Sequence, residues 1–317
     1  MLLVLLFIAT CCVAFTNGAN ANFKGVASLY GSGTASLRTT IWWGTATTFA
    51  GAITALFAAH GLLAAFSGKW LVPDALSQSP AFLLAVALGA AATSFLATRL
   101  SFPVSTTHAL IGALIGAGLA SGDHTVHPGP LVKTFVNPLF FSPLIAIAVG
   151  ALIYFVLKGV RLLPDHRTRT LDTLHFLSGG AASFARGLND TPKIAALLIV
   201  AKALDVRWDF ALVAVAMAIG GLLDARNVAE TLAKKITGMN PGEGFAANLA
   251  TALLVNTASF HSLPVSTTHV SVGSLLGIGI VTRKAKWKAV GQIVLSWIIT
   301  LPCAAALAAL AALLFSA

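Results

Sequence analysis

Charged side chains are scarce in this sequence: Asp, Glu, Lys and Arg make up 9% of its 317 residues, against about 25% in soluble domains. Hydrophobic residues make up 57%. This composition excludes an ordinary soluble protein and predicts an all-α polytopic membrane protein. We interpret ten apolar runs as membrane segments, at about 1–16, 41–65, 81–98, 107–120, 136–157, 176–201, 208–225, 245–260, 270–282 and 289–317.

Acidic residues and cysteines are also few. The 10 acidic residues face 20 basic ones, for a net charge of +10. In a soluble protein this excess can indicate nucleic-acid binding. In a membrane protein it is explained by basic cytoplasmic loops, so we expect no nucleic-acid partner. The 3 cysteines lie in apolar runs without metal-ligand spacing, so we expect neither a disulfide framework nor a metal site.

Two motifs occur twice, in the same order. The hexapeptide PVSTTH stands at 103–108 and 264–269, and GANANFKGVASL at 18–29 aligns with GLNDTPKIAALL at 187–198. This order predicts a duplicated chain with five hydrophobic segments per half. An odd number of membrane crossings per half inverts the second half relative to the first. If one pair of segments in each half is a re-entrant hairpin, three crossings remain, which is still an odd number. We predict a first inverted repeat at 1–157, a basic cytoplasmic linker at 158–173 and a second repeat at 174–317, with broken or re-entrant helices at the midplane.

Basic residues indicate the orientation of the chain. If each segment crosses once, the side of the linker collects twelve of them: Arg38, Arg99, Lys158, Arg161, Arg167, Arg169, Lys234, Lys235, Arg283, Lys284, Lys286 and Lys288. The other side collects four: Lys69, Lys133, Lys202 and Arg207. This bias predicts that both termini lie outside a bacterial-type plasma membrane. The first segment lacks a basic n-region and a convincing A-x-A cleavage site, so we expect it to be retained.

The four remaining basic residues fall within or close to apolar runs, where a charge is costly and usually functional. They are Lys24, Arg186, Lys193 and Arg226. Asp190 lies among them and is a further functional candidate. For Arg226 we favour a structural role, as the partner of Asp224 or Glu230 in a pair that locks helices together.

The PVSTTH copies have the character of helix starts inside a bundle. Ser and Thr are good N-cap residues, Pro suits a first helical turn, and a helix N-terminus attracts anions. We expect two hydroxyl-lined cradles for one tetrahedral oxyanion, formed by Ser105, Thr106, Thr107, Ser266, Thr267 and Thr268. The alternative is that these hydroxyls only cap or back-bond their helices. His108 and His269 follow directly, as proton acceptors or as hydrogen-bond donors from outside the site.

The other motif, called the Asn/Lys motif (18–29 and 187–198), places Gly and Asn in the middle of apolar runs, with Pro192 added in its second copy. Such sequences break helices, and a broken helix in a transporter often exposes its backbone to a substrate or ion. Asn20 and Asn189 offer amides, while Lys24 and Lys193 offer charges that an anion can satisfy. Asp190 can hold a cation, a proton or one of the lysines.

Together these motifs resemble the PiT family of inorganic phosphate transporters, which carries a duplicated G-A-N-D-x-x-N-like signature and a duplicated P-V-S-T-T-H element. The resemblance covers both halves of the chain. It implies a secondary active symporter of phosphate, driven by sodium or by protons, and a few relatives carry sulfate. Matching positions are Asn20, Asn189, Asp190, Ser105, Thr106, Thr107, Ser266, Thr267 and Thr268.

The chain departs from the family pattern in two ways. Ala21 stands where the family has an aspartate in the first copy, which impairs a coupling cation site if that aspartate forms one. Lys24 and Lys193 stand where the second asparagine is usual. Because an ammonium can take the place of a sodium ion, we expect sodium-independent and proton-coupled transport. Lys24, Lys193 and Asp190 sum to +1, so a dianion and one proton would make the site neutral.

Two other functions remain open, and a third, enzymatic one is rejected. A sulfate permease of the same fold would differ from a phosphate transporter in its substrate only. Sulfate at neutral pH has no hydroxyl that could donate a hydrogen bond to Asp190, whereas phosphate has one. An anion channel could use the same broken helices. An intramembrane hydrolase needs one asymmetric site, whereas every candidate here is duplicated, and G-x-S-x-G and H-E-x-x-H motifs are missing. Helices rich in small residues would permit a homodimer.

Overall fold

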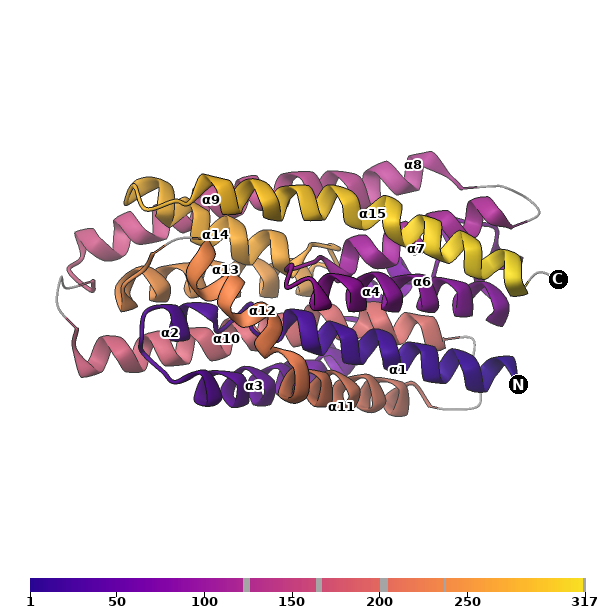
Figure 1. The fold of residues 1–317 in the computed structure, drawn as a ribbon, viewed down its shortest axis with the longest axis horizontal. Coiled ribbons are helices and arrows are strands. Elements are labelled where there is room, and N and C mark those ends of the chain that lie inside the picture. Colours follow the sequence, from indigo (N-terminus) through magenta and orange to yellow (C-terminus); the bar gives the residue numbers. More distant parts are fainter. Residues whose placement is uncertain (122–125, 164–166, 200–204, 237, 316–317) are drawn as a thin grey trace.

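The computed structural model describes residues 1–121, 126–163, 167–199, 205–236 and 238–315. Helices joined by turns and short extended segments make up this part of the chain (Figure 1). The first half contains α1 (Leu2–Ala21), α2 (Ala27–Gly31), α3 (Leu37–Ala58), α4 (His60–Phe66), α5 (Asp74–Ser77), α6 (Pro80–Arg99), α7 (Thr106–Ala120), α8 (Pro128–Pro130), η1 (Leu131–Val136) and α9 (Asn137–Gly159). The second contains α10 (Arg169–Ala195), η2 (Ala196–Leu198), α11 (Val206–Asp224), α12 (Arg226–Glu230), η3 (Thr231–Lys235), α13 (Pro241–Phe260), α14 (Thr267–Val281) and α15 (Trp287–Phe315).

The two halves repeat one arrangement with opposite direction, as the duplicated motifs predict. Helices α1, α3, α6, α7 and α9 correspond to α10, α11, α13, α14 and α15. The start of α1 and the end of α15 lie at one end of the long axis, and the end of α9 and the start of α10 lie at the other (Figure 1). Residues 164–166 of the predicted linker are outside the described residues, and so is Lys202. The limits of the two repeats remain a prediction.

Each half contains a helical hairpin that does not cross the molecule. Helices α6 and α7 lie in the half that holds the termini, and α13 and α14 lie in the opposite half (Figure 1). At the two tips Ser101 and Ser262 adopt left-handed φ angles of 59° and 58°, which turn the chain back. Arg99 therefore stands beside a hairpin tip rather than in a loop on the linker side. One crossing per segment was wrong for these pairs.

The two copies of the Asn/Lys motif end their helices at different positions. Helix α1 ends at Ala21, within the first Asn/Lys motif, as expected. Helix α10 continues past Pro192 to Ala195 and then changes to the 3-10 helix η2, so the break in the second copy of the motif comes after the proline. Proline removes one backbone donor, and the tertiary contacts of α10 with α3 and α13 keep it helical.

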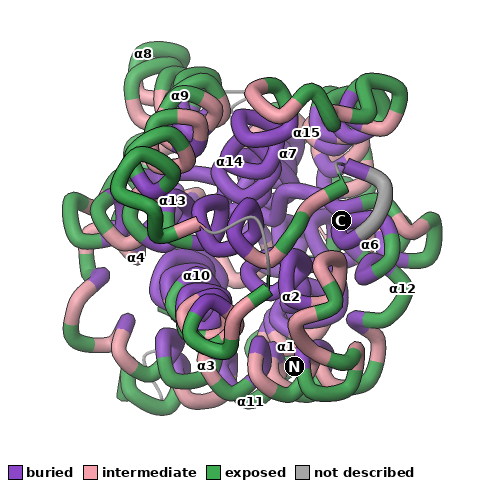
Figure 2. The backbone as a smooth tube through the Cα atoms, turned by 90° about the vertical axis from the view of Figure 1, so that its left-hand side faces the viewer, coloured by how far each residue is buried: buried purple, intermediate pink, exposed green. Residues whose placement is uncertain are grey.

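Among the described residues, six helices are long and apolar enough to cross a membrane by length and composition alone: Leu2–Ala21, Leu37–Ala58, Pro80–Arg99, Pro128–Gly159, Val206–Asp224 and Trp287–Phe315. Helix α10 has 27 residues, but charged residues interrupt its apolar run. Figure 2 shows α7, α10 and α14 buried at the centre, inside more exposed helices. The protein is therefore an integral membrane protein of two inverted repeats.

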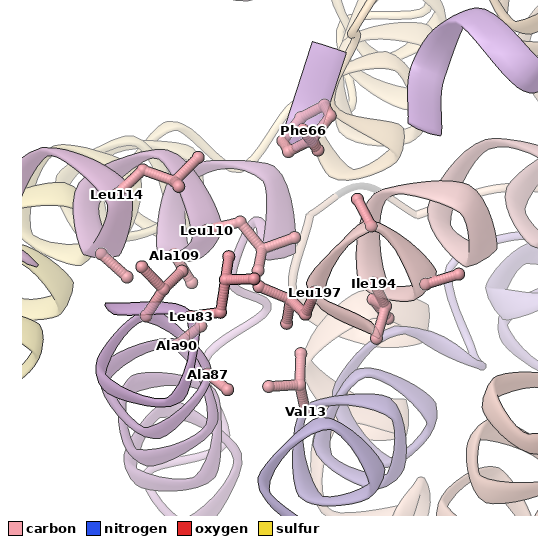
Figure 3. Packing of buried hydrophobic residues seen from close by; sticks show 14 of the residues in the cluster. Val13, Phe66, Leu83, Ala87, Ala90, Ala109, Leu110, Leu114, Ile194 and Leu197 are labelled. Carbon is pink, nitrogen blue, oxygen red and sulfur yellow. The ribbon is translucent and has the colours of Figure 1, made fainter. Parts of the chain in front are cut away.

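Apolar side chains lie on both sides of this centre along the long axis. The cluster toward the termini joins α1, α4, α6, α7, α10 and η2, and Figure 3 shows Phe66, Leu110 and Leu197 within it. A second cluster toward the linker includes Phe23, Leu232 and Phe245. The centre is thus closed toward both ends.

Glycines let the hairpins pack closely against neighbouring helices of the same chain. A Cβ added at Gly116 would lie 1.9 Å from the carbonyl oxygen of Ala305 on α15. In the second half, a Cβ at Gly277 would lie 2.2 Å from the carbonyl oxygen of Ile147 on α9. The small residues that suggested a homodimer therefore serve contacts within the chain.

We predict that Gly116→Val destabilises the protein by about 1–3 kcal/mol, because overpacking must push α7 away from α15. The matched control is Gly291→Ala on α15, where nothing lies within 4 Å of the added Cβ. Thermal unfolding of the purified protein in detergent would show a lower midpoint for the first variant and no decrease for the second. Equal midpoints would contradict the close packing of α7 on α15.

Candidate functional site

The tips of the two hairpins meet at the centre, where α7 and α14 begin. Ser105 is the N-cap of α7 and accepts from the backbone N of His108 at 3.2 Å. Ser266 caps α14 in the same way, with the same distance to His269 N. The predicted helix starts are confirmed. The two prolines, however, lie in the extended segments before the helices rather than in their first turns.

Two buried lysines bind these tips in matching ways. Lys24 Nζ donates to Val104 O of the first hairpin (2.7 Å) and to Thr268 Oγ1 of the second (2.5 Å). Lys193 Nζ donates to Val265 O of the second hairpin (2.7 Å) and to Thr107 Oγ1 of the first (2.9 Å). Each ammonium therefore connects both halves of the chain.

The two threonines complete this symmetric arrangement. Thr268 Oγ1 donates to Val104 O at 3.0 Å, and Thr107 Oγ1 donates to Val265 O at 3.3 Å. Each lysine thus faces one carbonyl and one hydroxyl that already contact each other. The carbonyls of Val104 and Val265 belong to the motif, but side-chain chemistry alone did not single them out.

The two asparagines of the Asn/Lys motif hold the hairpin tips. Asn20 donates to Thr98 Oγ1 (3.0 Å) and Phe102 O (2.9 Å) and accepts from Val104 N (2.9 Å). Asn189 donates to Ser259 Oγ at 2.9 Å and accepts from Lys193. Thr98 and Ser259 were missed by sequence reasoning, although they share the 161-residue offset of the hexapeptides.

The centre loses its symmetry at Asp190. Its carboxylate lies 3.4 Å from Lys193 Nζ and 3.8 Å from Arg186 Nε, and it accepts from Asn17 Nδ2 at 3.2 Å. The equivalent positions in the first half, 169 residues earlier, hold Asn17 and the buried Ala21. One half thus carries a buried ion pair where the other carries neutral side chains.

Arg186 and Asn17 connect this ion pair to the first half. Arg186 Nη2 donates to Asn17 Oδ1 (2.5 Å) and to Asn17 O (3.2 Å), while Nη1 donates to Thr48 Oγ1 (3.2 Å). Asn17 also donates to Thr106 Oγ1 at 2.8 Å. The 169-residue offset between Asn17 and Arg186 was the sequence signal for this pair.

The two motif histidines come together behind the helix starts. The rings of His108 and His269 have centroids 4.7 Å apart, and His269 also contacts Trp297 at 4.0 Å. Nδ1 of His269 lies 3.1 Å from Leu139 O. Because a carbonyl only accepts, that nitrogen is assigned the proton.

The residues singled out from the sequence thus meet in one buried cluster, while the other charged candidates lie elsewhere. Lys24 is 3% exposed, Lys193 1% and Asp190 2%. Thr267 Oγ1 lies 3.4 Å from Asp190 Oδ2, so all six cradle residues belong to the cluster or cap its helices. Arg226 and Glu230 are exposed instead, and Asp224 pairs with Arg99 at 3.8 Å.

Chemically, the cluster offers an anion three kinds of partner. Two helices begin in it, and the first backbone N–H groups of a helix have no partner within that helix. Hydroxyls line the cluster, and ammonium groups supply charge. Lys193 also lies 5.7 Å from the centre of the Phe66 ring, so the apolar cluster of Figure 3 reaches its ammonium directly. An anion in this place would be dehydrated and would interact strongly with each charge.

Inverted halves, paired hairpin tips and a buried polar centre define a membrane protein of the inverted-repeat transporter class. The phosphate transporter family matches residues 17–171 and 163–308. The chain belongs to this family.

Individual relatives agree with this assignment. A probable low-affinity inorganic phosphate transporter from Rhizobium meliloti (strain 1021) is 32% identical over 73% of this chain and 73% of its own length. A relative of the same description from Bacillus subtilis (strain 168) is 27% identical over 98% of this chain and 97% of its own. A solved structure titled the sodium-dependent phosphate transporter has the same fold, with a TM-score of 0.80, 21% identity and 99% of each chain covered.

We predict that Asp190→Ala destabilises the protein by about 3–5 kcal/mol, because it leaves Arg186 as a buried charge without its counter-ion. The double variant Arg186→Asn with Asp190→Ala copies the neutral pair of the first half and should recover most of this loss. Thermal unfolding in detergent measures both effects. If the double variant is no more stable than the single one, the two residues do not act as a pair.

Proposed function

We propose that this chain moves inorganic phosphate across the membrane by alternating access. The observation that carries the proposal is the meeting of two helix N-termini with Lys24 and Lys193 in a closed, buried centre. Membership of the phosphate transporter family supports it. The substrate lies between α7 and α14 and replaces some contacts that the lysines now make with the protein. This activity is transport and not catalysis.

Closure toward both ends suits this activity. An ion in the centre must pass one of the two apolar clusters to leave, and alternating access requires that the two paths open in turn. The hairpins carry the residues that contact the lysines, so movement of a hairpin changes the site and its path together. A channel would need both paths open at once, which favours a transporter.

The transporter works without sodium and is coupled to protons. The Lys193 ammonium is surrounded by Val265 O, Thr107 Oγ1, Asn189 Oδ1 and Asp190 Oδ1. Oxygen atoms of this kind are the ligands that hard cations prefer. A side-chain cation that is part of the chain therefore occupies the place where a free cation would bind.

Phosphate is favoured over sulfate by the carboxylate in the cluster. Monohydrogen phosphate can donate a hydrogen bond to Asp190, whereas sulfate would meet the same carboxylate with acceptors only. Ala21 removes the equivalent carboxylate of the first half, so this preference depends on Asp190 alone.

The orientation follows from the basic loops. We place the α9–α10 connection in the cytoplasm of a bacterial-type cell and both termini outside. The position of both termini at the end opposite to that connection supports this (Figure 1).

We predict that phosphate uptake into proteoliposomes changes by less than about twofold when potassium or choline replaces sodium, because the ammonium groups already fill the cation places. The matched variant Lys193→Asn removes one ammonium and should make uptake depend on sodium. A wild-type protein stimulated more than a few fold by sodium would contradict the proposal. The variant Ala21→Asp shows whether the missing carboxylate restores a sodium site.

We predict that Thr106→Val weakens phosphate binding about tenfold or more, because a hydrogen bond to a charged group is lost. The matched control is Thr54→Val, since the Thr54 hydroxyl bonds Ala50 O within α3. Calorimetry on the purified protein, with phosphate and sulfate compared, measures the effect. Tighter binding of sulfate would make the chain a sulfate permease, and no binding of either anion would refute the proposed function.

A further inference from the structure

The charge of the buried cluster differs from the sum that the motifs alone give. Arg186 lies in it, with Nε 3.8 Å from Asp190 Oδ2 and 2% of its surface exposed. Three cations therefore share one carboxylate. With every group ionised, the empty site holds two positive charges, and a phosphate dianion neutralises it without any further ion.

The costly step of the transport cycle is then the return of the transporter without substrate. A transporter that has released its substrate must return to the other side, and two uncompensated charges in a low-dielectric centre make that step slow. Loss of one proton from each lysine removes both charges. The resulting amines keep two N–H donors each, enough for Lys24 to retain its bonds to Val104 O and Thr268 Oγ1.

The geometry points to Lys24 and Lys193 as the proton carriers of the transport cycle. On the loading side two amines take up two protons and one HPO4 dianion binds between them. On the release side the dianion leaves, both ammonium groups lose their protons to water, and the neutral site returns. Each cycle moves two protons and one dianion in the same direction and no net charge. This inference rests on the proposed transport of phosphate.

Other titratable groups in the cluster are less suited to this role. The charged and titratable side chains around the two amines are Asp190 and Arg186 on α10, His108 on α7 and His269 on α14. Arg186 keeps its proton under all ordinary conditions, and Asp190 is its counter-ion. The histidines contact each other and Trp297 behind the helix starts, whereas the lysines touch both hairpins.

The repeat explains why there are two carriers. Lys24 and Lys193 occupy equivalent positions, and each contacts the carbonyl of its own hairpin and the threonine of the other. Movement of one hairpin relative to the other therefore changes the surroundings of both amines at once. Such a change can release both protons together with the substrate.

Replacement of both lysines by arginine tests the inference, because arginine keeps the charge but cannot release the proton. We expect Lys24→Arg with Lys193→Arg to lose net phosphate uptake by about tenfold or more, since the empty site can no longer become neutral. Exchange of internal for external labelled phosphate should continue, because the loaded site stays neutral. The control Lys69→Arg changes an exposed lysine and should alter neither rate.

Proteoliposomes at pH 8, where most phosphate is the dianion, separate the outcomes. A pH-sensitive dye inside should record two protons per phosphate for the wild type, with no effect of an imposed membrane potential. If the arginine variant keeps normal net uptake, the lysines are not the carriers, although phosphate transport stands. Loss of net uptake in the variant His108→Gln with His269→Gln, while exchange continues, would assign the protons to the histidines instead.

Exchange by the variants also reports on folding. If the double arginine variant shows neither exchange nor phosphate binding, the single variants Lys24→Arg and Lys193→Arg are used to test whether the lysines carry the protons. Each should carry one proton per phosphate and respond to membrane potential. Two protons per phosphate in both would overturn the inference, and a wild type without phosphate exchange would refute the proposed function itself.

Discussion

The contacts of Lys24 and Lys193 with the hairpin tips are the interaction on which the centre of this protein depends. Each ammonium joins a carbonyl of one hairpin to a threonine of the other. A buried charge of this kind is costly unless it is paired and hydrogen-bonded. The surrounding oxygens and Asp190 meet that requirement, so the same contacts that lower the cost of burial also fix how the two halves of the chain meet.

Most of the fold could be predicted from the sequence because the duplicated motifs carry long-range information. Two ordered repeats and an odd number of segments per half require inversion, whatever the path of each helix. The positions at which individual helices end were harder to predict. The turn after Ala21 and the uninterrupted helix through Pro192 arise from similar motif positions. What differs is tertiary packing, which overrides the local preference of proline and is invisible in the local sequence.

The residues that meet in the buried cluster could be named from the sequence, but their contacts with one another could not. Ser105, Thr107 and Lys193 could be named because polar residues are rare in apolar runs. That Lys193 contacts the threonine of the other half could not be deduced from one chain without coordinates. Arg186 stood out as an intramembrane charge, yet its place beside Asp190 required the structure. With every group ionised, that contact brings the sum of charges in the cluster to two rather than one.

The inverted repeat relates the two ends of the protein, but the side chains at repeat-related positions differ in polarity. Toward the linker, His175 bonds Ser28 at 2.9 Å and Ser28 bonds Asn248 at 3.0 Å, all buried. The repeat-related positions toward the termini are the apolar Leu6, Leu197 and Ala87. Polar groups cost less to hydrate than an apolar cluster of the same size, so water can reach the polar end at a smaller cost than the apolar end. The inverted repeat therefore gives the two ends the same helix arrangement, while its side-chain differences make the end toward the linker easier to hydrate than the end toward the termini.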